Sequence, residues 1–262
     1  LHAVACSTTL APTDTVLVAM SDGTRLATDY YLPDAEAGPC PVVLARSVYG
    51  RAWAGKHPAP MFLALGIAFV VQDTRGRGDS EGRDMVFADD GWGERRDGLD
   101  TVDWLLEQPW CNGAIGTWGT SALGITQLLL AGAGAEVRAQ SILVAAADFH
   151  GDLAYQGGVW RKSLCESWLT AQKSPHVIDI WKAHPTRDAF WRDGYDLVAR
   201  AEHMRAPALH ISGWFDIFAQ ASIDNFLARH YEGDPSARGR QILIMGPWPH
   251  GISPVSYTHL TL

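Results

Sequence analysis

The sequence lacks the features that mark several classes of protein. It has no apolar run of the roughly 20 residues that a membrane-spanning helix needs. Its 21 lysines and arginines form no basic run, and 29 acidic residues give a formal net charge of -8. This balance argues against a nucleic-acid partner. The composition therefore predicts a protein that acts on a small molecule, with neither a membrane nor a nucleic acid as its partner.

Cysteines and metal-binding motifs are also scarce. The four cysteines lie far apart, without the short paired spacing of zinc ribbons or redox motifs: Cys6, Cys40, Cys111 and Cys165. We interpret them as free thiols, with an extracellular disulfide as the open alternative; the compartment stays open too, with a cytoplasmic location favoured. No HExxH and no GxxxxGK[ST] occurs. We therefore expect no metal and no cofactor.

What the sequence does contain is enough apolar material for one large α/β domain. Of the 262 residues, 47% are hydrophobic and 19% are charged. Short continuous apolar runs are typical of strands covered on both faces in a parallel sheet, and they occur at 41–45, 67–72, 114–118, 141–146, 208–212 and 241–245. Residues 16–20 and 25–32 flank a Ser-Asp-Gly turn, which predicts an antiparallel hairpin at the edge. Helices are expected at 94–108 and 217–231. The expected fold is a mostly parallel sheet flanked by helices.

Residues 149–205 differ from the rest of the chain in their pattern of apolar, aromatic and charged residues. They show no clear strand pattern but many aromatic residues mixed with charges, which favours a helical insertion, here called the cap. We therefore divide the chain into a first part of the core at 1–148, the cap at 149–205 and a second part of the core at 206–262. Aromatic residues of the cap either form its own small core or contact a substrate.

The stretch from Gly113 to Ala133 centres on Ser121. A buried strand is expected before this serine and an apolar helix after it, so the serine falls on a sharp strand-to-helix turn. Such a turn projects the hydroxyl above the sheet and leaves the next backbone N–H, that of Ala122, facing a developing oxyanion. The GxSxxG pattern of Gly119 and Gly124 supplies the small neighbours that the crowded turn requires. The alternative is a glycine-punctuated junction with an incidental serine.

An acid and a histidine follow two later strands. Asp216 comes directly after the strand at 208–212, and His250 comes after the strand at 241–245. Each has a plainer alternative, because Asp216 could cap the following helix and His250 could be a surface histidine. The chain order serine, acid, histidine, each after an apolar strand, favours a catalytic triad.

Two earlier loops lie at the same expected sheet edge. Tyr49 follows the strand at 41–45 and could donate its phenol hydrogen to an oxyanion, with a half-buried loop tyrosine as the alternative. The loop at 73–82 is rich in glycine, but its acidic residues would repel phosphate. We favour a structural turn in which Arg75 pairs with a carboxylate over a catalytic role for Asp73 or Asp79.

Together these segments resemble the cocaine esterase and X-prolyl dipeptidyl-peptidase family of serine hydrolases. The resemblance covers roughly Asp14 to Gly251 and rests on ARSVYG, VVQDTRGRGDSEG, IGTWGTSALGITQLLLA, HISGWFDIFAQASIDNF and ILIMGPWPHG. It implies an α/β-hydrolase fold, a triad and an oxyanion hole formed by the residues at these positions: Ser121, Asp216, His250, Tyr49 and Ala122.

The sequence departs from the family at two places. Members usually carry a large residue after the nucleophile, where Ala122 stands here, so the pocket shape is expected to differ. Members also usually continue into a C-terminal jelly-roll domain, which we expect to be absent, and the tail from Ser253 to Leu262 has no family counterpart.

The function that the resemblance implies is hydrolysis of carboxylic esters through an acyl-enzyme. An X-prolyl dipeptidyl peptidase, an amidase or acylase, and a non-catalytic hydrolase-like binding protein stay open as alternatives, and so does the oligomeric state. Aromatic residues near the triad and in the cap are expected to form the substrate pocket: Trp160, Trp168, Trp214, Phe215 and Phe218. No carboxylate follows Asp216 closely, so we expect uncharged acyl groups to be preferred over those with a free α-amino group. The cap acids are interpreted as solvated surface residues: Asp148, Asp152 and Glu166.

Overall fold

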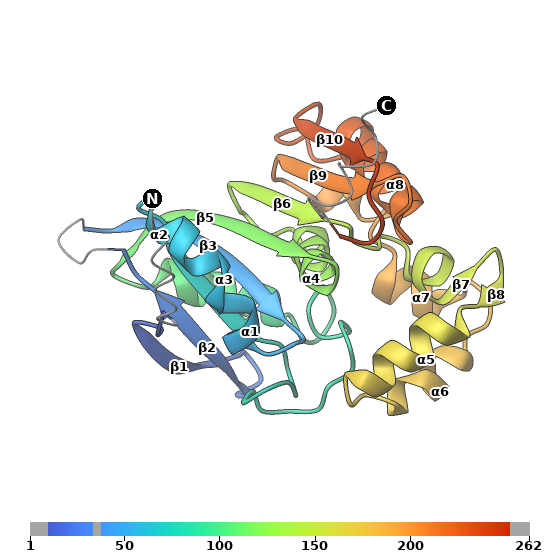
Figure 1. The fold of residues 1–262 in the computed structure, drawn as a ribbon, viewed down its shortest axis with the longest axis horizontal. Helices are drawn as coiled ribbons and strands as arrows, with labels where there is room; N and C mark the ends of the chain where they lie inside the picture. The colour runs from blue at the N-terminus through green and yellow to red at the C-terminus, as the bar shows by residue number, and fades with distance from the viewer. Residues whose placement is uncertain (1–9, 34–37, 252–262) are drawn as a thin grey trace, which may run out of the picture.

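A computed structural model describes residues 10–33 and 38–251 of the chain. Cys6 and the tail from Ser253 to Leu262 lie outside the described residues. The centre of the molecule is an eight-stranded sheet with the order β1-β2-β4-β3-β5-β6-β9-β10, flanked by helices (Figure 1). The predicted fold class, a mostly parallel sheet covered by helices, is confirmed.

The strand positions follow the apolar runs closely. The strands are β1 (Asp14–Ala19), β2 (Arg25–Tyr31), β3 (Cys40–Ser47), β4 (Ala68–Asp73), β5 (Cys111–Thr120), β6 (Ala139–Leu143), β9 (Ala208–Gly213) and β10 (Gln241–Gly246). Strands β1 and β2 pair antiparallel at one edge, β2 pairs antiparallel with β4, and the pairs from β4 to β10 are parallel. Every residue of β4 is buried, as its continuous apolar run predicts. The strand expected at 141–146 instead ends at Leu143, because Val144 has a φ of 46°, outside the β region.

Helices cover both faces of the sheet. They are α1 (Arg51–Lys56), α2 (Pro58–Leu63), α3 (Asp97–Leu106), α4 (Ala122–Gly132) and α8 (Ala219–Glu232). All eleven residues of α4 are buried, so this helix forms part of the core against β3, β5 and β6. Among the described residues, none of the helices combines the length and the apolar character that crossing a membrane would take.

The cap, which lies between β6 and β9 in the sequence, forms a separate lobe beside the sheet (Figure 1). It contains a π-helical turn (Phe149–Ala154), β7 (Tyr155–Gln156), β8 (Val159–Trp160), α5 (Lys162–Ala171), α6 (His176–Lys182), α7 (Ala189–Tyr195) and a 3-10 turn (Ala201–His203). The expectation of no strand in this region was wrong, since β7 and β8 pair as a hairpin. Each of these strands has only two residues, which is too short to show the alternation of apolar and polar residues from which a strand is predicted. Trp181 and Trp191 are 1% exposed and belong to an apolar cluster that continues from the cap to α4.

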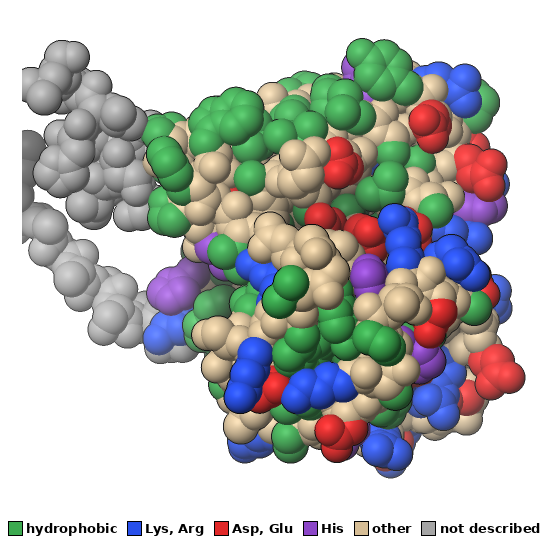
Figure 2. Space-filling view, turned by 90° about the vertical axis from the view of Figure 1, so that its right-hand side faces the viewer, with side chains coloured by type: hydrophobic (Ala, Val, Ile, Leu, Met, Phe, Trp, Pro, Cys, Tyr) green, Lys and Arg blue, Asp and Glu red, His purple; other side chains and the backbone are tan. Residues whose placement is uncertain are grey.

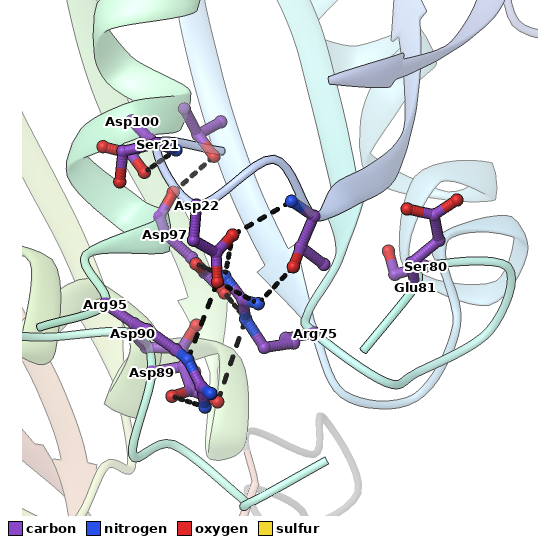
Figure 3. A network of polar contacts seen from close by, with 12 residues as sticks. Ser21, Asp22, Arg75, Ser80, Glu81, Asp89, Asp90, Arg95, Asp97 and Asp100 are labelled. Carbon is purple, nitrogen blue, oxygen red and sulfur yellow. Dashed lines mark hydrogen bonds and ion pairs between the residues drawn. The ribbon is translucent and has the colours of Figure 1, made fainter. Parts of the chain in front are cut away.

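The glycine-rich loop after β4 is fixed by ion pairs. Arg75 lies between Asp97, at 2.6 Å, and Asp22, at 2.8 Å (Figure 3). The guanidinium is 5% exposed, so it ties the first turn of α3 and the β1–β2 turn to this loop from inside the molecule. Asp73 accepts from Arg51 at 2.6 Å. These contacts confirm the expectation that Arg75 pairs with a carboxylate.

Candidate active site

Ser121 stands at the junction of β5 and α4. Its φ and ψ are 57° and -117°, a combination that a residue with a Cβ rarely adopts. The turn is held by main-chain hydrogen bonds: the Ser121 N–H donates to Leu143 O at 2.8 Å, and the Ser121 carbonyl accepts from Gly124 and Ile125. The strained turn therefore keeps the serine side chain at the carboxyl edge of the sheet.

Glycine is required on both sides of this serine because the packing is tight. A Cβ on Gly119 would lie 2.4 Å from the Leu123 Cβ, and one on Gly124 would lie 2.8 Å from the Ala145 Cβ. Real Cβ atoms do not approach this closely. The GxSxxG spacing is thus explained by the contact of the turn with α4 and with the segment that follows β6.

Asp216 lies on the loop between β9 and α8, and its carboxylate is fully buried. Its Oδ1 accepts from the Phe218 N–H at 2.5 Å, which orients the carboxylate. Main-chain hydrogen bonds join this loop to the one after β10, because Trp214 N–H donates to Gly246 O at 2.9 Å and Phe215 N–H donates to Trp248 O at 3.1 Å. The loops that carry the acid and the histidine are therefore built as one unit.

The three polar side chains form a continuous chain of hydrogen bonds. Ser121 Oγ lies 2.8 Å from His250 Nε2, and His250 Nδ1 lies 3.0 Å from Asp216 Oδ2. Since a carboxylate accepts only, Nδ1 carries the ring proton and Nε2 is left to accept from the serine hydroxyl. The imidazole and the Phe218 ring pack nearly perpendicular to each other, with the ring centres 5.3 Å apart. This arrangement can remove the serine proton as the hydroxyl attacks a carbonyl.

Two donors face the region above Ser121. Ala122 is the first residue of α4, where the amide N–H has no acceptor within the helix. Tyr49 is half-buried on the loop after β3, and its hydroxyl accepts from Trp168 Nε1 at 3.2 Å. Burial raises the pKa of the Tyr49 phenol, against the opposite effect of its contacts with Trp168 and Ser121. The phenol therefore keeps its proton at neutral pH and can donate it.

A cavity of about 350 Å³ opens beside Ser121 and His250, between the sheet edge and the cap. No Asp or Glu is among its described lining residues. Its wall is mainly aromatic and aliphatic, formed by Trp53, Phe87, Ile125, Leu153, Leu164, Cys165, Trp168, Trp181, Ile217 and Phe218. Burial raises the pKa of the Cys165 thiol to about 12, so this side chain acts as a small apolar group. The cavity suits an uncharged, apolar group.

The structure brings together some of the predicted pocket residues and separates others. Trp168 and Phe218 line the cavity, whereas three predicted residues do not: Trp160, Trp214 and Phe215. Trp214 and Phe215 are 62% and 74% exposed because their backbone hydrogen bonds to the loop after β10 turn them outward. Trp160 packs against Tyr155 and donates to Glu166 at 3.2 Å, within the cap.

Sequence reasoning missed most of the cavity wall. Ile217 directly follows Asp216, so its position in the sequence could have predicted that it lines the cavity. Trp181 and Leu153 belong to the cap, and nothing in their local sequence distinguishes a residue at the cavity from one in the cap core. Their contribution depends on how the cap packs over the sheet.

The cap acids are partly buried, which contradicts their interpretation as solvated surface residues. The Asp148 carboxylate pairs with Arg187 at 3.3 Å, and Glu166 pairs with Lys182 at 2.5 Å. Burial raises the pKa of Asp152 to about 6. None of the three acids lines the cavity, because their partners lie within the cap itself.

Within the described part of the chain, no group of three His, Cys, Asp or Glu side chains is placed to hold a metal ion. Residues 22–176 and 163–252 match the model of the X-Pro dipeptidyl-peptidase (S15) family. The chain is 32% identical over 288 residues to the cocaine esterase of Rhodococcus sp. (strain MB1 Bresler), covering 90% of this chain and 48% of that protein. It thus spans about half the length of this relative.

Solved structures show the same fold. An α-amino acid ester hydrolase superposes with a TM-score of 0.72 at 22% identity, over 93% of this chain and 48% of that chain. A CocE/NonD family hydrolase from Staphylococcus aureus superposes with a TM-score of 0.76 at 20% identity, over 91% and 46% of the two chains. At these identities the likeness extends to the fold alone.

Proposed function

Since the chain belongs to the X-Pro dipeptidyl-peptidase (S15) family, we propose that it is a serine hydrolase that cleaves carboxylic esters through an acyl-enzyme. In this proposal Ser121 is the nucleophile, His250 is the general base and acid, and Asp216 orients the imidazole. The observation that carries the proposal is the unbroken chain of hydrogen bonds from Ser121 to Asp216, at the mouth of an apolar cavity.

The reaction follows from these contacts. His250 Nε2 takes the proton as Ser121 Oγ bonds to the ester carbonyl carbon, and the negative charge moves to the carbonyl oxygen. The Ala122 N–H and the Tyr49 hydroxyl donate to that oxygen. When the intermediate collapses, the C–O bond to the alcohol breaks and His250 protonates the departing alcohol. A water then attacks the acyl-enzyme in the same way, which releases the acid and restores Ser121.

Asp216 acts in both steps by stabilising the cation that forms on His250. Its carboxylate is excluded from water and held by the Phe218 N–H, so it needs no reorganisation when the imidazolium forms. The Trp168 indole donates to the Tyr49 oxygen, which leaves the phenol hydrogen to point elsewhere. This supports a donor role for Tyr49 toward the oxyanion.

The cavity favours esters over X-prolyl peptides. A substrate with a free α-amino group would bring an ammonium into an apolar wall without a carboxylate, at a desolvation cost of several kcal/mol. An X-prolyl dipeptidyl peptidase or an amidase stays as the alternative, which the family name suggests.

A fluorophosphonate probe tests the nucleophile. We expect the purified protein to be labelled and the Ser121→Ala variant not to be labelled. Ser236→Ala is the matched control, since Ser236 is an exposed serine on the loop after α8. Absence of labelling in the unmodified protein would favour a non-catalytic, hydrolase-like binding protein.

Substrate class is tested separately. Short p-nitrophenyl esters and aminoacyl-proline p-nitroanilides are compared by kcat/KM with the same preparation. We expect the esters to be cleaved and the anilides to be poor substrates. The opposite ranking would identify the protein as a peptidase.

A further inference from the structure

A second hollow adjoins the catalytic cavity at the start of α5. It is a groove of about 600 Å³, and it shares Leu164, Trp168 and Ile217 with the cavity beside Ser121. A substrate held at Ser121 can therefore continue into the groove. The remaining lining residues are Arg161, Lys162, Ser163 and Ser167.

The polar side chains of this groove can supply two positive charges and two hydroxyls, and no Asp or Glu is among the lining residues that the structure describes. This composition contrasts with the chain as a whole, which carries a net charge of -8. It also contrasts with the catalytic cavity, whose wall is mainly apolar. The two hollows thus offer an apolar space and a cationic space side by side.

The acids nearest to the groove already have partners. Glu166 pairs with Lys182 at 2.5 Å, the main cause of the lowered pKa of its carboxyl, and Lys162 adds only a minor attraction. The Asp152 carboxylate accepts from the Asp148 N–H at 2.8 Å. Arg161 donates to the main-chain oxygen of Asp152, which holds its side chain without neutralising its charge.

Lys162 is exposed and next to Arg161, so two like charges lie together at the groove. Figure 2 looks onto the side of the molecule that carries the cap, where Lys, Arg, Asp and Glu side chains lie beside apolar surface. An anion placed near both cations relieves their repulsion and gains charge-assisted hydrogen bonds. An ammonium group placed there would instead be repelled by both cations.

We propose that this groove is a subsite for an anionic group of the substrate, so that the enzyme prefers esters that carry a carboxylate away from the scissile bond. The inference rests on the proposed esterase function. The apolar cavity takes the uncharged part of the substrate next to the ester, and Arg161 and Lys162 bind the distant carboxylate. Monoesters of dicarboxylic acids and esters of hydroxybenzoic acids have this chemistry.

Two matched substrate pairs test the subsite and show which part of the ester enters it. Monophenyl glutarate is compared with its terminal amide, which places the charge on the acyl side. 4-Acetoxybenzoate is compared with 4-acetoxybenzamide, which places the charge on the leaving group. We expect kcat/KM to favour the anionic member at least tenfold in one pair, and the preference to shrink between 0.05 and 0.5 M salt. A ratio of one or less in both pairs overturns the subsite.

Charge-neutral variants identify the residues responsible. Arg161→Gln combined with Lys162→Gln should bring the anionic-to-neutral ratio close to one. Lys162→Gln alone should lower the ratio about threefold, and it avoids disturbing the Arg161 contact with the cap main chain. Lys56→Gln is the matched control, since Lys56 is an exposed lysine on α1. An unchanged ratio in the double variant overturns the assignment.

The fluorophosphonate reaction separates the two proposals. A protein that is labelled at Ser121 and cleaves neutral esters, but shows no anionic preference, refutes the subsite and leaves the hydrolase proposal standing. A protein that is not labelled refutes the hydrolase proposal itself.

Discussion

Arg77 connects the loop that carries Tyr49 to the cap, and replacing it is predicted to slow acylation. Its Nε and Nη2 atoms donate to Val48 O at 2.8 and 2.6 Å, one residue before Tyr49. The same guanidinium donates to Gln172 Oε1 at 3.0 Å, just beyond the end of α5, and pairs with Asp84 at 3.1 Å. One side chain thus sets the Tyr49 loop against the helix that carries Trp168.

The expected magnitude follows from the proposed role of Tyr49 as an oxyanion donor. Losing one oxyanion donor typically costs about 10²- to 10³-fold in kcat. Arg77 does not touch the oxyanion but positions the donor, and a displacement of about 1 Å can cost about 10²-fold. We therefore expect Arg77→Lys to lower kcat by about 10- to 100-fold. Lysine keeps a positive charge near Asp84 but lacks the planar guanidinium whose Nε and Nη2 both donate to the Val48 carbonyl.

The assay measures kcat and KM separately on a neutral p-nitrophenyl ester, together with the melting temperature. A fall in kcat with little change in KM is expected, because the oxyanion forms only in the transition state. Arg83→Lys is the matched control, since Arg83 is an exposed arginine on the same loop.

A double-mutant cycle separates positioning from general stabilisation. If Arg77 acts through Tyr49, then Arg77→Lys should cost little in a Tyr49→Phe background. An equal loss of kcat in both backgrounds would refute the reasoning. So would a lower melting temperature with kcat unchanged, which would make Arg77 a structural residue only.

Three further predictions concern the site and the cap. Tyr49→Phe keeps the ring packing and removes one donor, so kcat should fall about a hundredfold; an unchanged kcat with an altered KM would show that Tyr49 only lines the pocket. Phenylacetate methyl ester should be cleaved with a higher kcat/KM than phenylglycine methyl ester at a pH where the amine is charged, since the described residues around the cavity include no carboxylate; the opposite preference would point to the cap acids. Burial raises the pKa of Asp152 from 3.8 to about 6, so the folded state holds a proton that the unfolded state loses between pH 4 and 6. Its contribution to stability is therefore lost as the pH rises through that window, and Asp152→Asn should flatten the dependence in urea unfolding at pH 4 to 7. An equally steep dependence in the variant would assign the effect to other groups.

The core of the fold could be predicted from the sequence because most strands of the sheet contain a short apolar run. The strand at Ala208–Gly213 begins where the pattern predicts, although it includes two polar residues, His210 and Ser212, whose side chains are buried in the sheet. Where prediction and structure differ, a backbone conformation decides. The helix expected from Glu94 begins at Asp97, because Arg96 has a φ of -137° and a ψ of 49°.

The positions of the proposed triad residues could also be anticipated, since strand ends in a parallel sheet meet at one edge. The cavity wall could not be predicted in the same way. Trp168 and Trp160 lie in the same aromatic segment, yet only Trp168 reaches the cavity. Trp160 is instead held within the cap by its contacts with Tyr155 and Glu166.

The charges around the cavity show why substrate specificity could not be predicted from the sequence of the cap. The chain offers both signs in this region, with Glu166 and Asp152 close in sequence to Arg161 and Lys162. Tertiary pairing decides which sign faces a substrate. Glu166 forms its ion pair with Lys182, which comes from α6. Lys162 lines the groove and forms no ion pair in the described structure, although it weakly attracts the Glu166 carboxylate. A net acidic chain can therefore present a basic groove beside the cavity at Ser121, and the proposed preference for an anionic substrate group rests on the cap's internal ion pairs rather than on the overall charge.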